Sequence, residues 1–235
     1  MIIAEKFIRA IEIDNLNFFY LPVPKNGTSS FKNLIFFLDY NKMFKETKIS
    51  EFCGIHSIYP TQHTLDRRYV KKYKFLRTYF KLNFLNYHSL FITRDPIERF
   101  LSGFNDRVLF QNKLKISYSN NFDKLNFFID NFEKFLFENQ DINWHFSSQY
   151  SFLKIYKKRY DKIIFIKLNN IREFLFKKTK GLLKERVVKF YDKDQHNFNS
   201  TKSKKSISPI TVNDLNSRQI EFIKSFYQKD FNLNL

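Results

Sequence analysis

The sequence predicts a single α/β domain, residues 1–235, in which a parallel sheet is covered by helices on both faces. Apolar, β-prone runs occur at 17–23, 87–93 and 162–168. Each run is followed by a stretch that reads as a helix, at 28–40, 96–110 and 170–178. Strands that alternate with helices favour a parallel sheet buried on both sides, and 235 residues are typical of one domain.

The segments between these strand–helix units have weaker patterns. Residues 50–58 are expected to form a short strand or turn, and residues 64–82 a helix rich in basic and aromatic side chains. Residues 122–138 carry apolar side chains at helical spacing, namely Phe122, Leu125, Phe128, Ile129, Phe132, Phe135 and Leu136.

The last third of the chain is expected to contain a loop and a final helix. Gly181 is expected to end the helix that begins near residue 170, because glycine is favoured just past a helix end. Residues 193–209 are polar and predict a loop. Residues 211–229 predict a helix with Thr211 or Asn213 as its N-cap.

Composition limits the kind of partner. The chain has 31 Phe and 13 Tyr and is 43% hydrophobic, which predicts a globular core. A formal net charge of +18 favours anionic partners: a nucleotide, an acidic glycan, nucleic acid or an anionic membrane. The abundance of Lys, Asn, Ile and Phe is equally typical of an AT-rich genome, so the positive charge alone does not decide between a functional and a genomic origin.

Cysteine usage and hydropathy indicate a cellular compartment. Cys53 is the only cysteine, which excludes an intrachain disulfide and a cysteine-based zinc site and favours a reducing compartment. No apolar run approaches the roughly 20 residues of a membrane span. Residues 1–6 lack the pattern of a secretory signal. We therefore expect a cytoplasmic protein without a transmembrane segment, and peripheral contact with a membrane stays open.

The loop Pro24-Lys25-Asn26-Gly27-Thr28-Ser29-Ser30 lies between the first predicted strand and its helix. A glycine and three hydroxyl residues at a helix N-terminus leave backbone N–H groups free to hold an anion, and Lys25 adds positive charge. The loop is therefore a candidate phosphate site. It is not a Walker A loop, because the lysine precedes the glycine.

A second segment, Arg94 to Ser102, follows the second predicted strand. Pro96 suits the first turn of a helix. Arg94 and Ser102 are eight residues apart, about two helical turns, so they are able to converge on one phosphate. Arginine offers a bidentate fork and serine a short hydroxyl donor.

With these motifs the chain resembles the PAPS-dependent sulfotransferases, which use 3′-phosphoadenosine 5′-phosphosulfate (PAPS) as donor. Residues 24–30 are similar to their 5′-phosphosulfate loop, and Arg94-Asp95-Pro96-Ile97-Glu98-Arg99-Phe100-Leu101-Ser102 to their 3′-phosphate motif. Cys53-Gly54-Ile55-His56 resembles the Cys-Gly-Leu-His segment of carbohydrate O-sulfotransferases, especially the heparan sulfate 6-O type. The resemblance is continuous from about Phe18 to Arg107. It implies a sulfotransferase fold, similar to that of P-loop NTPases.

The resemblance implies roles for individual residues of the first loop and the histidine segment. Lys25 would stabilise charge on the leaving 5′-phosphate, and Asn26, Gly27, Thr28, Ser29 and Ser30 would hold the donor. His56 would be the general base, with Glu51 and His63 as rivals. The Asp that follows this histidine in the 6-O type is Ser57 here, which puts a substrate contact in doubt.

Roles also follow for the second motif and for two later segments. Arg94 and Ser102 would hold the 3′-phosphate, whereas Asp95 and Arg99 are expected to brace the turn. Trp144-His145 with Gln149 resembles a His-x-x-x-Gln segment of the carbohydrate group, which would line the acceptor cleft or brace it. The segment from His196 to Lys202, within the polar stretch up to 205, resembles a loop that closes over the nucleotide; a solvated basic loop is the other interpretation.

The sequence thus predicts a bacterial, cytoplasmic, PAPS-dependent O-sulfotransferase with a carbohydrate or glycan acceptor, the product PAP, and no metal ion. It indicates no oligomeric state. One alternative is a P-loop-type small-molecule kinase, for which the lysine lies on the wrong side of the glycine. Another is a basic nucleic-acid-binding module, suggested by interleaved basic and aromatic residues at 67–75, which leaves both phosphate motifs unexplained.

Overall fold

The structure is a computed structural model that describes residues 10–42, 81, 86–118, 120–194 and 208–234. The strand or turn expected at 50–58 lies outside these residues, and so does the helix expected over 64–82 apart from Lys81. Most of the loop expected at 193–209 lies outside them too.

A four-stranded sheet forms the centre of the described part, in the order β1 (Ile11–Ile13), β2 (Phe18–Leu21), β3 (His88–Thr93) and β4 (Ile163–Lys167). β2, β3 and β4 are parallel, which confirms the three strands predicted from the apolar runs. β1 was not predicted. It pairs antiparallel with β2 as an edge strand, and a one-turn 3-10 helix, η2 (Asp14–Leu16), connects the two strands.

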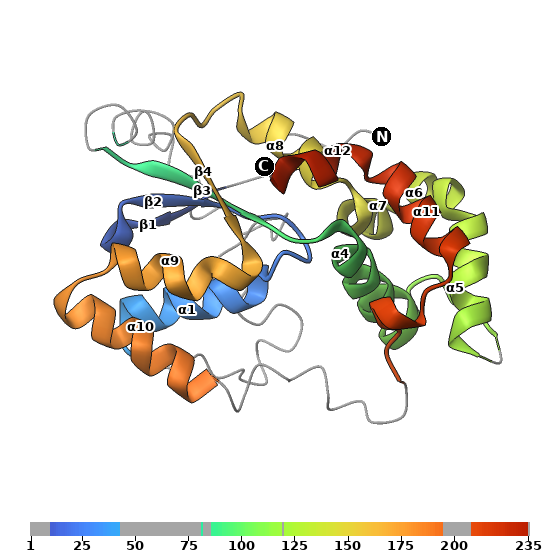
Figure 1. Ribbon diagram of the computed structural model, residues 1–235, viewed down its shortest axis with the longest axis horizontal. Coiled ribbons are helices and arrows are strands. Elements are labelled where there is room, and N and C mark those ends of the chain that lie inside the picture. Colours follow the sequence, from blue (N-terminus) through green and yellow to red (C-terminus); the bar gives the residue numbers. More distant parts are fainter. Residues whose placement is uncertain (1–9, 43–80, 82–85, 119, 195–207, 235) are drawn as a thin grey trace.

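Helices cover both faces of this sheet, as Figure 1 shows. On one face α1 (Thr28–Tyr40), α9 (Ile171–Lys178) and α10 (Gly181–Asp194) share a core with β1, β2 and β3. On the other face α8 (Gln149–Tyr156) packs against Leu21, Val23 and Phe91. The predicted fold class is therefore confirmed.

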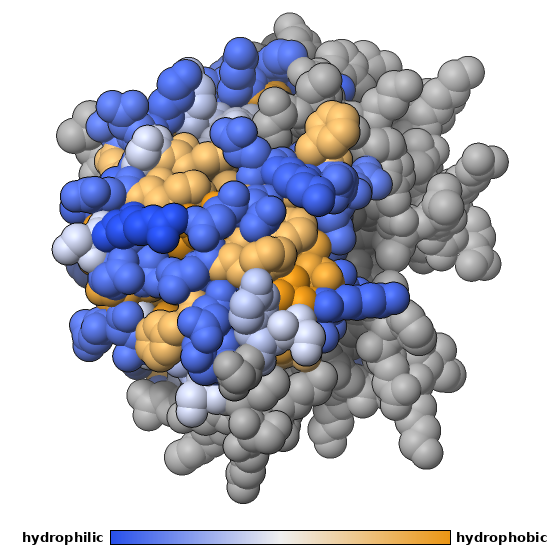
Figure 2. Space-filling model, turned by 90° about the vertical axis from the view of Figure 1, so that its right-hand side faces the viewer, coloured by the Kyte–Doolittle hydropathy of each residue, from blue (hydrophilic) through white to orange (hydrophobic). Residues whose placement is uncertain are grey.

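A second core, rich in aromatic side chains, lies beside the sheet. It is built by α4 (Pro96–Gly103), the π-helix η5 (Phe104–Phe110), α5 (Asn121–Asp130), α6 (Phe132–Glu138), α7 (Gln140–Phe146) and α11 (Ser217–Phe226). The Phe146 ring lies 5.4 Å from Phe100 and 5.0 Å from Phe128, in the tilted and edge-on arrangements that aromatic rings prefer. The outer side of this helical layer is mainly hydrophilic, with apolar side chains between the polar ones (Figure 2).

Several helix boundaries differ from the sequence-based expectation. The 122–138 helix is two helices, because the chain turns at Asn131 between α5 and α6. The final helix is replaced by η8 (Val212–Asp214), α11, α12 (Gln228–Phe231) and η9 (Asn232–Asn234). Thr211 is the N-cap residue of the short helix η8, whereas the N-cap of α11 is Asn216 and not Thr211 or Asn213 as predicted.

Gly181 does not merely follow the end of α9. That helix ends at Lys178, and Gly181, with a φ of +51°, begins α10. Helix α10 extends to Asp194, so the polar stretch expected as a loop begins later than predicted. The helices α7, α8 and α10 were not predicted.

Among the helices of the described residues, none is both long and apolar enough to cross a membrane.

Candidate functional site

The two predicted phosphate motifs meet where the parallel strands β2 and β3 end, at the carboxyl edge of the sheet. The register pairs Leu21 of β2 with Phe91 of β3, so both parallel strands run toward the same edge. The loop that contains Lys25 follows β2, and Arg94 follows β3 directly. In open parallel sheets ligands bind outside the carboxyl ends of the strands, so the motifs lie where a ligand site is expected.

The first loop bends sharply before α1. Lys25 and Gly27 both have left-handed backbone conformations, with φ values of +67° and +72°. Thr28 Oγ1 donates to Val23 O at 2.6 Å and accepts from Tyr20 Oη at 3.2 Å, which fixes the loop to its own strand. Because α1 has no side-chain cap and no acidic residue in its first turn, its positive end is available to an anion.

Gly27 is in close contact with the connection that follows β4. A Cβ atom built on Gly27 would lie 2.5 Å from Leu168 Cδ1, a residue of the one-turn helix η6 (Leu168–Asn170). Only glycine allows both this approach and the positive φ. At the start of α1, Ser29 is exposed and Ser30 is half-buried, so both lie near the surface of the helix end.

The amino group of Lys25 pairs with the carboxylate of Asp106, which lies in the π-helix η5. Burial lowers the pKa of Lys25, and Asp106 partly offsets this by stabilising the ammonium. Burial alone would raise the pKa of Asp106, but Lys25, Arg107 and a hydrogen bond from Gln111 bring it below its ordinary value. The carboxylate of Asp106 is therefore charged at neutral pH, and its charge favours the ammonium form of Lys25. Sequence reasoning missed Asp106 because it lies 81 residues from Lys25 and in no recognised motif.

Arg94 contacts the first loop through its side chain. Its Nη1 donates to Lys25 O at 3.1 Å, and its Nε approaches Glu98 Oε2 at 3.4 Å. A pocket of about 170 Å³ lies beside it, lined by Thr93, Arg94, Asp95, Glu98, Lys167, Leu168 and Asn169. Ser102, half-buried on α4, is not among the described residues that line this pocket.

A buried amide network joins the two motifs. Asn26 and Gln149 are both fully buried. Asn26 Nδ2 donates to Gln149 Oε1 at 2.6 Å and to Ile92 O at 2.7 Å. Gln149 also bonds the backbone of Arg94, accepting from its N–H at 2.9 Å and donating to its carbonyl at 2.8 Å. The side chain of Asn26, assigned to the donor site by resemblance, is thus turned into the protein and braces the loop.

Arg99 and Asp95 also act on the backbone. Arg99 is 1% exposed; it donates to Pro24 O at 3.1 Å and to Ser147 O at 2.6 Å. Asp95 accepts from the N–H groups of Ile97 and Glu98 and caps α4. The bracing role expected for both residues is what the structure shows.

His145 is occupied by protein contacts on both ring nitrogens. Nδ1 lies 2.8 Å from Asp141 O, and Nε2 lies 2.5 Å from Arg107 Nη2. Because arginine only donates, Nε2 accepts, and Nδ1–H donates to the carbonyl. Burial lowers the pKa of His145 most, so the neutral ring is favoured. Trp144 packs edge-on against Phe152 at 5.0 Å. Of the two interpretations of this segment, these contacts fit bracing.

Three candidates for the general base, Glu51, His56 and His63, lie outside the described residues, as do Cys53 and the 196–205 loop. Within the described part of the chain, no three His, Cys, Asp or Glu side chains are grouped to hold a metal ion.

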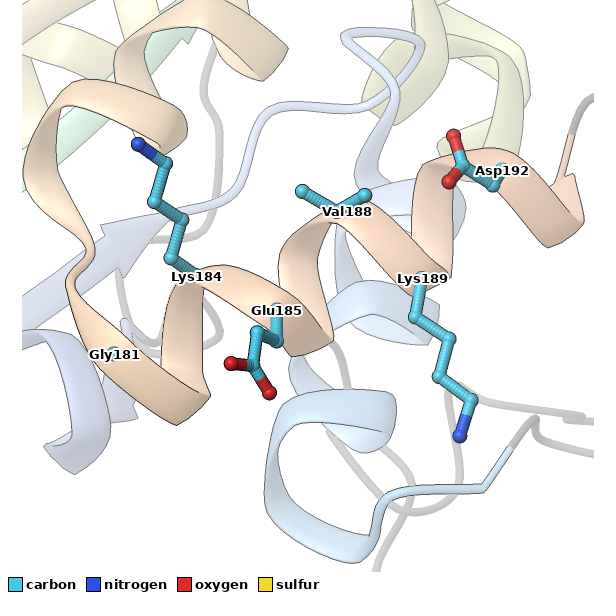
Figure 3. A pocket seen from close by; sticks show the side chains of 6 residues that line it. All are labelled: Gly181, Lys184, Glu185, Val188, Lys189 and Asp192. Atoms are coloured by element: carbon cyan, nitrogen blue, oxygen red, sulfur yellow. The ribbon is translucent and has the colours of Figure 1, made fainter.

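A larger pocket of about 760 Å³ lies along α10, away from both motifs. The described residues that line it are Gly181, Lys184, Glu185, Val188, Lys189 and Asp192. Figure 3 shows Lys184 and Lys189 pointing in different directions, so their charges do not converge on one point. The edge of the sheet remains the better candidate site.

Comparison with protein families found a match over most of the chain. A family model described as "Sulfotransferase family" matches residues 10–233, which span the sheet, both motifs and the helical layer. No curated protein and no solved structure matches the chain.

Proposed function

The chain belongs to the sulfotransferase family, and from this premise we propose that it transfers a sulfuryl group from PAPS to a hydroxyl group of a carbohydrate. Membership makes the protein a sulfotransferase and implies PAPS as the sulfate donor. The carbohydrate acceptor, the base and the individual site residues are the finer parts of the proposal.

The observation that supports the proposal is that two candidate anion-binding segments meet at the carboxyl ends of β2 and β3. PAPS carries a phosphosulfate and a separate 3′-phosphate on one nucleoside, so it needs two such segments at a fixed separation. The uncapped start of α1 and Lys25 suit the first group, and Arg94 suits the second. The kinase and nucleic-acid alternatives do not account for this pairing.

In sulfuryl transfer, negative charge accumulates on the leaving 5′-phosphate while the acceptor hydroxyl loses its proton. Lys25 is proposed to stabilise that charge, and the N–H groups at the start of α1 to hold the same phosphate. Gly27 permits the close approach of the backbone, and Ser29 and Ser30 add hydroxyl donors. Because Lys25 pairs with Asp106 in the structure, its amino group must exchange partners when the donor binds.

The acceptor hydroxyl requires a base. His56 is proposed for this role, with Glu51 and His63 as rivals, on the resemblance of Cys53-Gly54-Ile55-His56 to the segment of carbohydrate enzymes. The net charge of +18 suits an acidic glycan. Independence from metal ions and a place in the bacterial cytoplasm stay predictions.

The first test is calorimetric binding of PAP, the product nucleotide, to wild type, Arg94→Ala and Arg218→Ala. Loss of a charge-assisted contact of about 1.5–3 kcal/mol predicts roughly 10- to 100-fold weaker binding for Arg94→Ala. Arg218 pairs with Asp130 on the exposed helical layer and is the matched control. Absence of PAP binding to wild type, with or without a chelator, would refute the proposed donor.

The acceptor is tested separately, by transfer of labelled sulfate from PAPS to a panel of acidic and neutral glycans. We expect transfer to a carbohydrate hydroxyl that is lost in His56→Ala, while PAP binding is retained. Transfer only to non-carbohydrate hydroxyl compounds would refute the carbohydrate acceptor and leave the sulfotransferase assignment intact.

A further inference from the structure

Gln149 is the one described side chain that bonds both the loop after β2 and the chain after β3 through its amide group. Its Oε1 accepts from Asn26 Nδ2 at 2.6 Å and from Arg94 N at 2.9 Å, and its Nε2 donates to Arg94 O at 2.8 Å. Gln149 is fully buried. A buried side chain with these bonds has one orientation, because any rotation would leave polar groups without partners.

The position of Gln149 is itself fixed by contacts with the C-terminal part of the chain. The buried carboxylate of Asp230, on α12, accepts from Gln149 N and Tyr150 N, both at 2.8 Å, at the start of α8. Tyr227 Oη donates to Phe146 O at 2.6 Å just before that start. A carboxylate at a helix N-terminus satisfies free N–H groups and interacts favourably with the helix dipole. The C-terminal helices thus hold Gln149 against the two motifs.

The hydrogen bonds of Gln149 reach both segments that are proposed to hold the phosphates of one ligand. Asn26 lies between Lys25 and Gly27 of the first loop, and Arg94 is the candidate ligand of the second motif. Gln149 holds the Arg94 backbone at both its N–H and its carbonyl. A movement of either loop relative to the other would break at least one of these bonds.

We propose that Gln149 is a positioning residue that sets the separation of the two phosphate sites and thereby selects a nucleoside with phosphates at both its 3′ and 5′ positions. The inference rests on the proposed function, because it presumes that both motifs bind one nucleotide. A nucleotide with two phosphates binds more tightly than either monophosphate only when the two phosphate sites are held at the matching distance. Gln149 does not touch the ligand in this role.

A role in folding alone makes a different prediction. Removal of a buried amide would then lower the stability of the protein. It would weaken the binding of all three nucleotides to a similar extent, or leave the binding of all three unchanged. A positioning role predicts selective loss of the advantage that the bisphosphate has over the monophosphates. The readout is therefore the ratio of affinities for PAP and for adenosine 5′-monophosphate and adenosine 3′-monophosphate.

The experiment compares wild type with Gln149→Met, which keeps a similar volume and removes all three amide bonds. The matched control is Gln219→Met: Gln219 is also buried near a helix start, bonded to Asn126 and Asn216, away from both motifs. Thermal unfolding confirms that each variant is folded. Gln149→Glu, which retains an acceptor oxygen for Asn26 and for Arg94 N and removes the donor to Arg94 O, serves if the methionine variant does not fold.

We expect Gln149→Met to lose roughly tenfold or more in PAP affinity while both monophosphates change less than about twofold, with no such change in Gln219→Met. In Gln149→Glu the ratio of the PAP affinity to the monophosphate affinities is expected to fall as well, but by less. Equal losses for all three nucleotides, or unchanged PAP affinity, would overturn the positioning role. Wild type that binds neither PAP nor the monophosphates would instead overturn the proposed function.

Discussion

Replacement of Asp106 by asparagine is expected to tighten PAP binding at pH 6 and to make it depend on pH. In the structure the Lys25 amino group is held by Asp106, so a phosphate bound there must compete with this carboxylate. The side chains are 14% and 27% exposed. Asparagine keeps the shape and an acceptor for Gln111 but removes the competing charge.

The size of the effect follows from the pair that is broken. A hydrogen bond to a charged group contributes about 1.5–3 kcal/mol, and partial exposure reduces this toward about 1–2 kcal/mol. Removal of the competitor therefore predicts roughly 5- to 30-fold tighter PAP binding at pH 6. The same change is expected to lower the free energy of unfolding by a similar amount, because a half-buried ammonium loses its partner.

The pH dependence has a defined sign. Burial lowers the pKa of Lys25, and Asp106 opposes that shift, so its removal lowers the pKa further. In the proposed function PAP binds the ammonium form of Lys25. As pH rises, the free variant loses this charge at a lower pH than wild type does. Binding then requires uptake of a proton, and PAP affinity begins to fall at a lower pH than in wild type.

The assay is calorimetry with PAP at pH 6, 7.5 and 9, together with urea unfolding. Asp130→Asn is the matched control, because it removes a carboxylate from an exposed pair with Arg218. Binding to Asp106→Asn that is no tighter than wild type at pH 6 would refute the competition between Asp106 and the phosphate. A pH profile parallel to that of wild type would refute the role of Asp106 in keeping Lys25 charged.

Two further substitutions test the loops directly. Gly27→Ala is expected to lower the free energy of unfolding by about 1–2 kcal/mol because of its positive φ, and further because of the clash with Leu168. It is also expected to weaken PAP binding. Urea unfolding and calorimetry measure the two effects, and a variant with unchanged stability would contradict the close approach. Arg99→Met is expected to lower the free energy of unfolding by about 2–4 kcal/mol, because the carbonyls of Pro24 and Ser147 lose a buried charged donor. Its PAP affinity should fall less than that of Arg94→Ala, and the reverse order would show that Arg99, not Arg94, is the ligand.

The elements with local signals were predicted well from the sequence. The helix expected at 28–40 is α1, Thr28–Tyr40, because Gly27 at its start and the apolar spacing that follows are local features. The three parallel strands were found because buried strands are continuous apolar runs. The one-residue break at Asn131 was not found, since apolar spacing continues through it.

Helices and strands that are not marked by a continuous apolar run were not predicted, although some of them begin with a recognisable capping residue. Asn139 caps α7 and Ser148 caps α8, so both helix starts had a recognisable signal. β1 had none: three residues cannot show a period, and the strand exists because β2 offers a free edge. Its pairing is a tertiary event that local sequence does not specify.

For the site, the sequence indicated which segments meet but not how they are held. Motif reasoning treats each residue of a loop as a possible ligand, and Asn26 shows why this overcounts. A tight loop that presents its backbone to an anion must itself be anchored, and the anchor uses side chains that point inward. Asn26, Arg99 and Gln149 are such anchors, and their partners lie 46 to 123 residues away along the chain.

The same reasoning explains why the helical layer matters to a site at the edge of the sheet. Arg99 reaches Pro24 from α4, and its guanidinium lies over the Tyr227 ring at 5.9 Å. Asp230, three residues later, holds the start of α8 and with it Gln149. The last part of the chain therefore supports the loops after β2 and β3 indirectly, through Arg99 and Gln149. Substitutions at Tyr227 or Asp230, far from either motif in sequence, should consequently change nucleotide affinity as well as stability.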